Sequence, residues 1–155
     1  MTERRRRPLS SAEARRTLNA RRGFLGEDFS SFELTTVQLA GKRIAACSFA
    51  SSDLRSATFD GAWVRDCDFS AANLQGASLR GAHLTACRFM GADLRGADLR
   101  RASLRSQNTG DRSGNCDLTG AVLGGAAMRD LQYEVGTCWP EEFDAALAGA
   151  LPING

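Results

Sequence analysis

The chain has 155 residues, of which 43% are hydrophobic, 7% aromatic and 25% charged, and its net charge is +2. This length supports one domain, with a core built mainly from Leu, Ala and Phe. No apolar run approaches the roughly 20 residues of a membrane span, and the basic start is not followed by the apolar stretch of a secretory signal. Five cysteines without CxxC spacing favour a reduced, cytoplasmic protein.

Residues 1–23 are predicted to form an Arg-rich tail and a capping helix. They carry eight arginines against two glutamates. Ser10 with Glu13 makes a capping box and Gly23 suits a C-cap, so a helix is expected over about 11–22, where it would cover the open end of the next element. The run Arg4 to Arg7 either binds phosphate or acidic lipid, or is a solvated tail.

Residues 24–133 are organised by a period of five. Every fifth residue from Phe29 to Leu104, sixteen in succession, is large and apolar, and the residue two places earlier is Ala, Cys or Ser from Cys47 to Ala102. Neither a helix nor a strand has this period. A chain that turns a corner every five residues would point both positions inward, and four corners make a square coil whose turns stack at roughly 4.8 Å.

A weaker period of twenty supports the square coil. The residues with this spacing are Phe29, Phe49, Phe69 and Phe89. The last three of them each follow a cysteine by two places, namely Cys47, Cys67 and Cys87. We therefore predict one interior column of stacked Phe rings beside a column of Cys.

The stretches "SAANLQGASLRGAHL" and "GADLRGADLR" resemble the A(D/N)LXX pattern of the pentapeptide-repeat family. This resemblance implies an all-β solenoid, a right-handed quadrilateral (pentapeptide-repeat) β-helix with short N- and C-terminal capping helices. Such a fold does not by itself imply a function.

The repeat stops after Leu104, and an inserted loop is expected at about 105–115. If nine residues are inserted, Cys116 and Leu118 take the next places in the Cys and Phe columns. The polar loop is expected to be exposed. It is either a tolerated surface insertion or a partner contact, a role that projecting loops have in topoisomerase-protecting members of the family that the chain resembles.

Residues 134–155 are predicted to close the last turn of the coil with a short helix. "WPEEF" suits a helix start, and the apolar residues that follow share one helical face. The segment resembles the terminal T-x-W-P-x-x-F-D closure of the family, whose members often dimerise through this end. We therefore take Trp139, Phe143, Leu147 and Leu151 as candidate contacts of a homodimer.

One outward column of the coil combines Arg, Trp and His, residue types that often anchor interfaces. With their neighbours and the inserted loop, the candidate interaction residues are Arg43, Trp63, Arg65, His83, Arg105, Asp111 and Arg112. The alternative is a solvated wall whose charges pair between neighbouring turns.

The sequence predicts no catalytic, cofactor-binding or metal site, because it has one His and no GxSxG, P-loop or HExxH motif. We therefore expect a non-enzymatic protein-interaction scaffold.

The resemblance suggests a second role, binding of a type II topoisomerase such as gyrase by DNA mimicry, in drug resistance or self-protection, although the coil is too nearly neutral for a DNA mimic. Two further alternatives are nucleic-acid or membrane association through the Arg-rich start and modification by a peptide-modifying enzyme. No direct DNA binding by the coil is expected.

Overall fold

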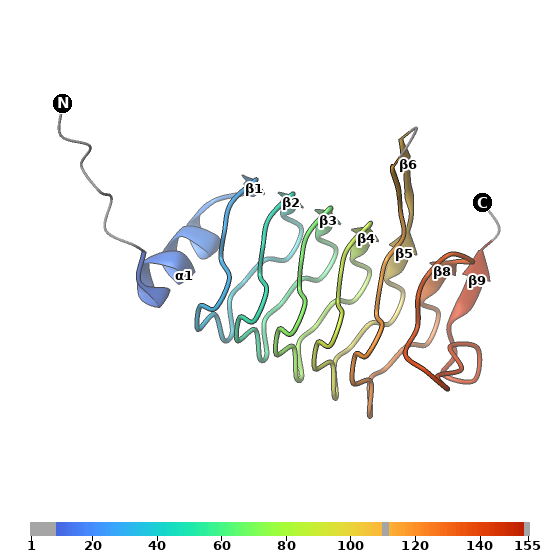
Figure 1. The fold of residues 1–155 in the computed structure, drawn as a ribbon. Coiled ribbons are helices and arrows are strands. Elements are labelled where there is room, and N and C mark those ends of the chain that lie inside the picture. The colour runs from blue at the N-terminus through green and yellow to red at the C-terminus, as the bar shows by residue number, and fades with distance from the viewer. Residues whose placement is uncertain (1–8, 110–111, 154–155) are drawn as a thin grey trace.

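The computed structural model describes residues 9–109 and 112–153, and within them the chain winds into a coil with one helix at its N-terminal end (Figure 1). The helix α1 is Ser11–Ala20. The strands are β1 Gly23–Leu25, β2 Arg43–Ala45, β3 Trp63–Arg65, β4 His83–Thr85, β5 Ser103–Arg105, β6 Gln107–Thr109, β7 Arg112–Gly114, β8 Gln132–Glu134 and β9 Leu151–Ile153.

One wall of the coil is a parallel sheet with the strand order β1-β2-β3-β4-β5-β8-β9. Phe24 pairs with Ile44, and Ile44 with Val64, so successive rungs are one square of twenty residues apart. Isolated parallel bridges such as Asp28 to Ser48 continue this pairing on the other walls. The molecule is therefore an all-parallel β-solenoid of about six turns, as the period of five predicts.

The core contains the predicted columns of side chains. The rings of Phe29, Phe49, Phe69 and Phe89 stack with centroid distances of 5.3, 5.1 and 5.0 Å. The adjacent column consists of the buried cysteines Cys47, Cys67, Cys87 and Cys116. Cys87 Sγ donates to the carbonyl of Val64 at 3.5 Å, so its polar hydrogen has a partner inside the core.

Most corners of the coil have a residue in the left-handed conformation, two positions after a buried centre. Gly61 follows Phe59 with φ 63°, and Ala71 follows Phe69 with φ 56°. Glycine adopts this conformation readily, whereas alanine does so at a cost. Five residues per side thus reflect three extended residues and a tight corner.

Helix α1 begins with the predicted capping box. Glu13 N–H donates to Ser10 Oγ at 3.2 Å, and Ser10 N–H donates to Glu13 Oε2 at 2.8 Å. The predicted C-cap was wrong: the helix ends at Ala20 with Arg21 as its C-cap, and Gly23 begins β1 instead. The segment Arg4 to Arg7 lies outside the described residues.

The helix covers the first turn of the coil. Ala14 and Leu18 are fully buried and belong to the same apolar core as the Phe column. Lys42, at the end of this first turn, donates through Nζ to the carbonyl oxygens of Leu18 and Asn19 near the end of the helix. A cation placed there neutralises the partial negative charge of a helix C-terminus, which helps to hold α1 in place.

The inserted loop contains an antiparallel hairpin of β6 and β7, which projects from the coil beside the sheet (Figure 1). Gln107 pairs with Gly114, so the two ends of the hairpin lie next to each other at the corner after β5. The coil then resumes in the predicted register, because Asp117 bridges to Arg88 just as Arg88 bridges to Asp68.

The C-terminal segment corrects one expectation, because residues 140–150 form turns and not a capping helix. The chain instead makes a further turn of the coil. Leu118 N–H donates to Cys138 O at 2.7 Å, which places Trp139 after Leu118 in the Phe column, and β9 pairs with β8. The prediction was wrong because the open ladder of β8 offers hydrogen bonds, such as Leu151 N–H to Leu131 O at 2.7 Å, that hold this segment in the coil.

Candidate functional site

The outer face of the parallel sheet carries two columns of side chains, one on each side of the buried centres. Both arise because every strand repeats the register of the strand before it. The column before the centres contains Gly23, Arg43, Trp63, His83, Ser103, Gln132 and Leu151. The column after them contains Leu25, Ala45, Arg65, Thr85, Arg105, Glu134 and Ile153.

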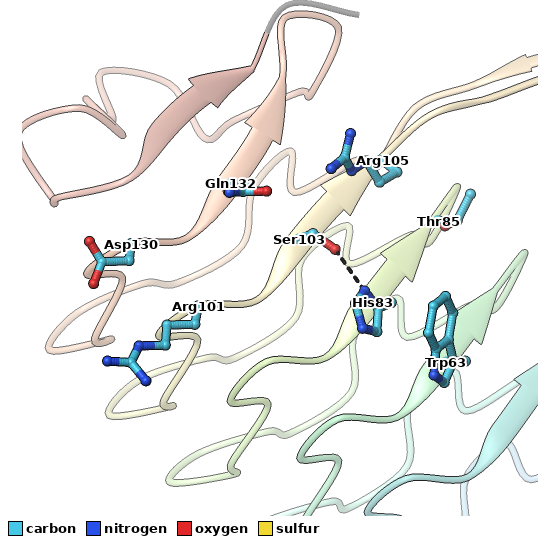
Figure 2. Close-up of a pocket in the computed structure, with 8 residues that line it drawn as sticks. All are labelled: Trp63, His83, Thr85, Arg101, Ser103, Arg105, Asp130 and Gln132. Atoms are coloured by element: carbon cyan, nitrogen blue, oxygen red, sulfur yellow. Dashed lines mark hydrogen bonds between the residues drawn. The ribbon is translucent and has the colours of Figure 1, made fainter.

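An aromatic pair occupies the middle of this face. The rings of Trp63 and His83 are parallel to within 21° with centroids 3.9 Å apart. His83 Nδ1 lies 3.3 Å from Ser103 Oγ, and Figure 2 shows the three side chains in line across β3, β4 and β5. Ser103 is only 8% exposed, so the imidazole is fixed between a buried hydroxyl and the indole.

Trp63 is 57% exposed although it has this partner. His83 covers one face of the indole, and no second ring or cation–π contact to Trp63 occurs among the described residues. A large apolar surface held by its neighbours, with its other face open, is available to a ligand without rearrangement.

Four arginines surround the aromatic pair: Arg43, Arg65, Arg101 and Arg105. Arg65 Nε lies 3.5 Å from Asp66, and Arg105 Nη1 lies 3.9 Å from Glu134. Both ion pairs are long and solvated, so the two carboxylates hold these arginines only weakly. In the described part of the chain, Arg43 and Arg101 have no ion-pair partner.

Two hollows follow this face and share Trp63, His83 and Thr85. One has a volume of about 440 Å³ and lies toward β2; the other, of about 600 Å³, lies toward β8 and is drawn in Figure 2. We call them together the sheet-face groove. Its lining side chains are Arg43, Trp63, Arg65, His83, Thr85, Arg101, Ser103, Arg105, Asp130 and Gln132.

The base of the hairpin is attached next to the groove. Ser106 donates to Glu134 Oε2 through its N–H at 2.9 Å and also through its hydroxyl. These hydrogen bonds lower the pKa of Glu134, outweighing the opposing effect of burial. With its amide nitrogen turned toward Asp66, Gln107 donates to both carboxylate oxygens at 3.0 and 3.2 Å. The hairpin is thus bound to turns on both sides of it.

Five of the predicted interaction residues lie along the groove: Arg43, Trp63, Arg65, His83 and Arg105. Arg112 begins β7 in the hairpin, and Asp111 lies outside the described residues.

The predicted dimer contacts lie in the last turn of the coil, where Leu151 pairs with Gln132 at the β8 end of the groove. Trp139 and Phe143 are partly buried with ring centroids 5.4 Å apart, whereas Leu147 is 87% exposed and Leu151 is also exposed. These four side chains do not form one stripe of a helix, because no helix forms there.

Five residues of the groove were not among the candidates from the sequence: Thr85, Arg101, Ser103, Asp130 and Gln132. Arg101 is a corner residue with φ 60°. Counting in steps of five along the sequence assigns it to the neighbouring wall of the coil, that of Leu99. Gln132 follows Ser103 in its column only across the hairpin. The register of Tyr133, extended through the insertion, was the signal that could have found it.

Residues 9–109 and 112–153 contain neither a metal site nor a membrane-spanning helix. No group of His, Cys, Asp and Glu there could hold a metal ion. The same residues contain no helix of the length and apolar character needed to cross a membrane.

The comparisons with known proteins agree with this architecture. A family model described as pentapeptide repeats, in eight copies, matches residues 37–70 and 67–105. A coil with five residues per side and Leu or Phe at each centre is what this repeat builds, and the chain belongs to the pentapeptide-repeat family.

Several solved structures share the fold at low identity. A trypsin-treated variant of QnrB1, a plasmid-mediated fluoroquinolone resistance protein, is 17% identical, covers 84% of this chain and 89% of its own, and has a TM-score of 0.51. The pentapeptide-repeat protein Rfr23 from the cyanobacterium Cyanothece 51142 is 21% identical over 76% of this chain and 84% of its own, with a TM-score of 0.46. A pentapeptide-repeat protein from Nostoc is 22% identical over 96% of this chain and all of its own, with a TM-score of 0.42. No curated protein sequence matches the chain.

Proposed function

We propose that this chain is a non-catalytic scaffold that binds another protein through the sheet-face groove. The observation that carries the proposal is the exposed indole of Trp63, held against His83 at the centre of a groove lined by arginines. Tryptophan and arginine dominate the binding energy of many protein interfaces.

The coil suits this role because it presents the groove on a rigid frame. The strands beneath Trp63 and His83 are paired on both sides, and their central residues Val64 and Leu84 are buried in the core. Side chains held in this way lose little conformational freedom on binding, which leaves more of the contact energy for affinity.

The test is the capture of a partner from lysate of the source cells. The bait proteins are the wild type, Trp63→Ala and Met90→Ala, the last an exposed apolar side chain outside the groove. We expect the wild type and Met90→Ala to retain the same protein and Trp63→Ala to lose it. Retention by all three baits would refute the proposal.

The projecting hairpin favours a second candidate, binding of a type II topoisomerase. The supporting similarity is to QnrB1, a fluoroquinolone resistance protein, and at 17% identity it concerns the fold. The near balance of 20 basic and 18 acidic residues speaks against DNA mimicry. A gyrase supercoiling assay with and without a quinolone tests this candidate, which predicts protection by the wild type and less protection after replacement of residues 106–114 by a short glycine linker. Unchanged supercoiling and drug sensitivity at micromolar protein would remove it.

A further inference from the structure

We propose that the sheet-face groove binds an extended acidic peptide segment that carries one aromatic side chain. This inference rests on the proposed function and names the chemistry of the partner at the same site. It follows from the length of the groove, the placement of its arginines and the open face of Trp63.

The groove has the length of a short extended peptide. Its two hollows join at Trp63, His83 and Thr85 and together run from β2 to β8, which is four steps of the sheet. At about 4.8 Å per step this is about 19 Å, and an extended chain rises about 3.3 Å per residue. The groove therefore accommodates about six residues.

The positive charge of the groove is concentrated in two pairs of arginines, one at its β2 end and one at β5, a single step before its β8 end. Arg43 and Arg65 lie on β2 and β3, while Arg101 and Arg105 lie on or just before β5. The stretch between them is lined by uncharged or aromatic side chains. The two arginine pairs are separated by two or three sheet steps, about 10 to 14 Å, or three to four residues of an extended peptide. Acidic residues near both ends of the segment would meet both pairs.

The indole supplies the aromatic contact. The open face of Trp63 is turned toward β2, beside Arg43 and Arg65, because its other face rests on His83 of β4 with centroids 3.9 Å apart. An aromatic side chain in the half of the peptide nearer β2 would stack there, and stacking adds to the free energy gained from burying its area. The geometry thus favours an aromatic residue with acids on both sides, the nearer ones meeting Arg43 and Arg65 and the farther ones meeting Arg101 and Arg105.

Single-stranded nucleic acid fits the same groove less well. Proteins that bind it stack successive bases on several aromatic side chains, and this groove offers one open aromatic face. Asp66, Asp130 and Glu134 also stand beside the arginines, where they would face a phosphate at every nucleotide. A peptide can place uncharged residues opposite these carboxylates.

The experiment is fluorescence anisotropy of the labelled hexapeptide Asp-Glu-Phe-Ser-Asp-Glu with the full chain. Matched probes replace Phe by Ser, or all four acids by Lys, and an oligothymidylate of about ten nucleotides represents single-stranded nucleic acid. We expect the acidic aromatic peptide to bind, the Lys peptide not to bind, and the Ser peptide to bind at least about tenfold more weakly.

The protein variants locate the binding. Trp63→Ala and Arg101→Glu should each raise the Kd at least about tenfold, because each removes an aromatic anchor or reverses an unpaired charge. Met90→Ala and Arg80→Glu, which change exposed residues outside the groove, should leave it unchanged. Circular dichroism of each variant checks that the coil is intact.

Three outcomes would overturn the inference. They are binding of the oligothymidylate but not of the acidic peptide, binding of the peptide that Trp63→Ala and Arg101→Glu do not weaken, and no peptide binding at all. If a partner is still captured from lysate in a Trp63-dependent way, the last outcome leaves the proposed function standing and removes only the peptide chemistry.

Discussion

The Phe column allows the contribution of ring stacking to stability to be measured at one position. Phe69 is buried between Phe49 and Phe89, with centroids 5.1 and 5.0 Å away and planes parallel to within 4° and 5°. It also meets Phe59 edge-on at 5.7 Å. We choose the substitution Phe69→Leu, because the same column accepts leucine at Leu118.

The expected loss follows from the number of ring contacts. Each aromatic pair contributes about 0.5–1.5 kcal/mol beyond its buried area, so the three pairs of Phe69 predict a loss of about 1.5–4.5 kcal/mol in the free energy of unfolding. Phe29 has two ring partners, Phe49 at 5.3 Å and Phe24 at 5.7 Å. Phe29→Leu should therefore cost about 1–3 kcal/mol, less than Phe69→Leu by about one pair.

Urea unfolding followed by far-ultraviolet circular dichroism measures both variants. With a slope of about 1–3 kcal/mol per molar urea, one aromatic pair shifts the midpoint by about half a molar. The slopes must agree with that of the wild type for the comparison to hold. If Phe29→Leu costs as much as Phe69→Leu or more, ring stacking is not what stabilises the column.

Four other variants or measurements test the core, the thiols, the hairpin base and the C-terminal end. Leu74→Asp should abolish the circular dichroism signal of the coil, since it buries an unpaired carboxylate; a native spectrum would contradict the register. A thiol reagent should modify only Cys138 in the native protein, because burial raises the pKa of the Cys116 thiol to about 11 and the other three cysteines are also buried; modification of more than one thiol before unfolding would count against this. Glu134→Gln should lower the melting temperature more at pH 7 than at pH 3, because a carboxyl whose pKa is lowered from 4.5 stabilises the fold above that pH and loses this effect as the pH falls toward and through its folded value; an equal loss at both pH values would show that the charge is irrelevant. Sedimentation velocity should find a homodimer that Leu147→Asp dissociates, because this exposed side chain lies at the open C-terminal end; a wild-type monomer at every concentration would refute the dimer.

The sequence allowed the core to be predicted because every turn repeats the same spacing. Phe29, Phe49 and Phe69 reveal the square once the period of twenty is seen, and this column is stacked in the structure. Cys116 kept the register recognisable across the insertion, since it is the next cysteine of a buried column. Strict geometry at the corners is what makes such counting possible.

The parts that escaped prediction are those where the count changes or where hydrophobicity gives no signal. Trp139 follows Leu118 in the Phe column by 21 residues, so one extra residue after Tyr133 concealed its place. The strands of the hairpin are polar throughout, and only a loop could be expected there. The groove was predicted in part, because the columns of Trp63 follow from the register, whereas the direction of a corner side chain such as Arg101 does not.

The position of the hairpin bears on how proteins of this architecture diversify. The hairpin replaces the corner expected two residues after Leu104. Its basal pair, Gln107 with Gly114, returns the chain to the place where it left the coil. The rungs above and below close over this junction without a change of register, as the bridge from Arg88 to Asp117 demonstrates. A corner of the coil can therefore accept an inserted hairpin while the register of the surrounding turns stays the same. New surface elements can be added to such a molecule by insertions at single corners, without any change in the residues of its core.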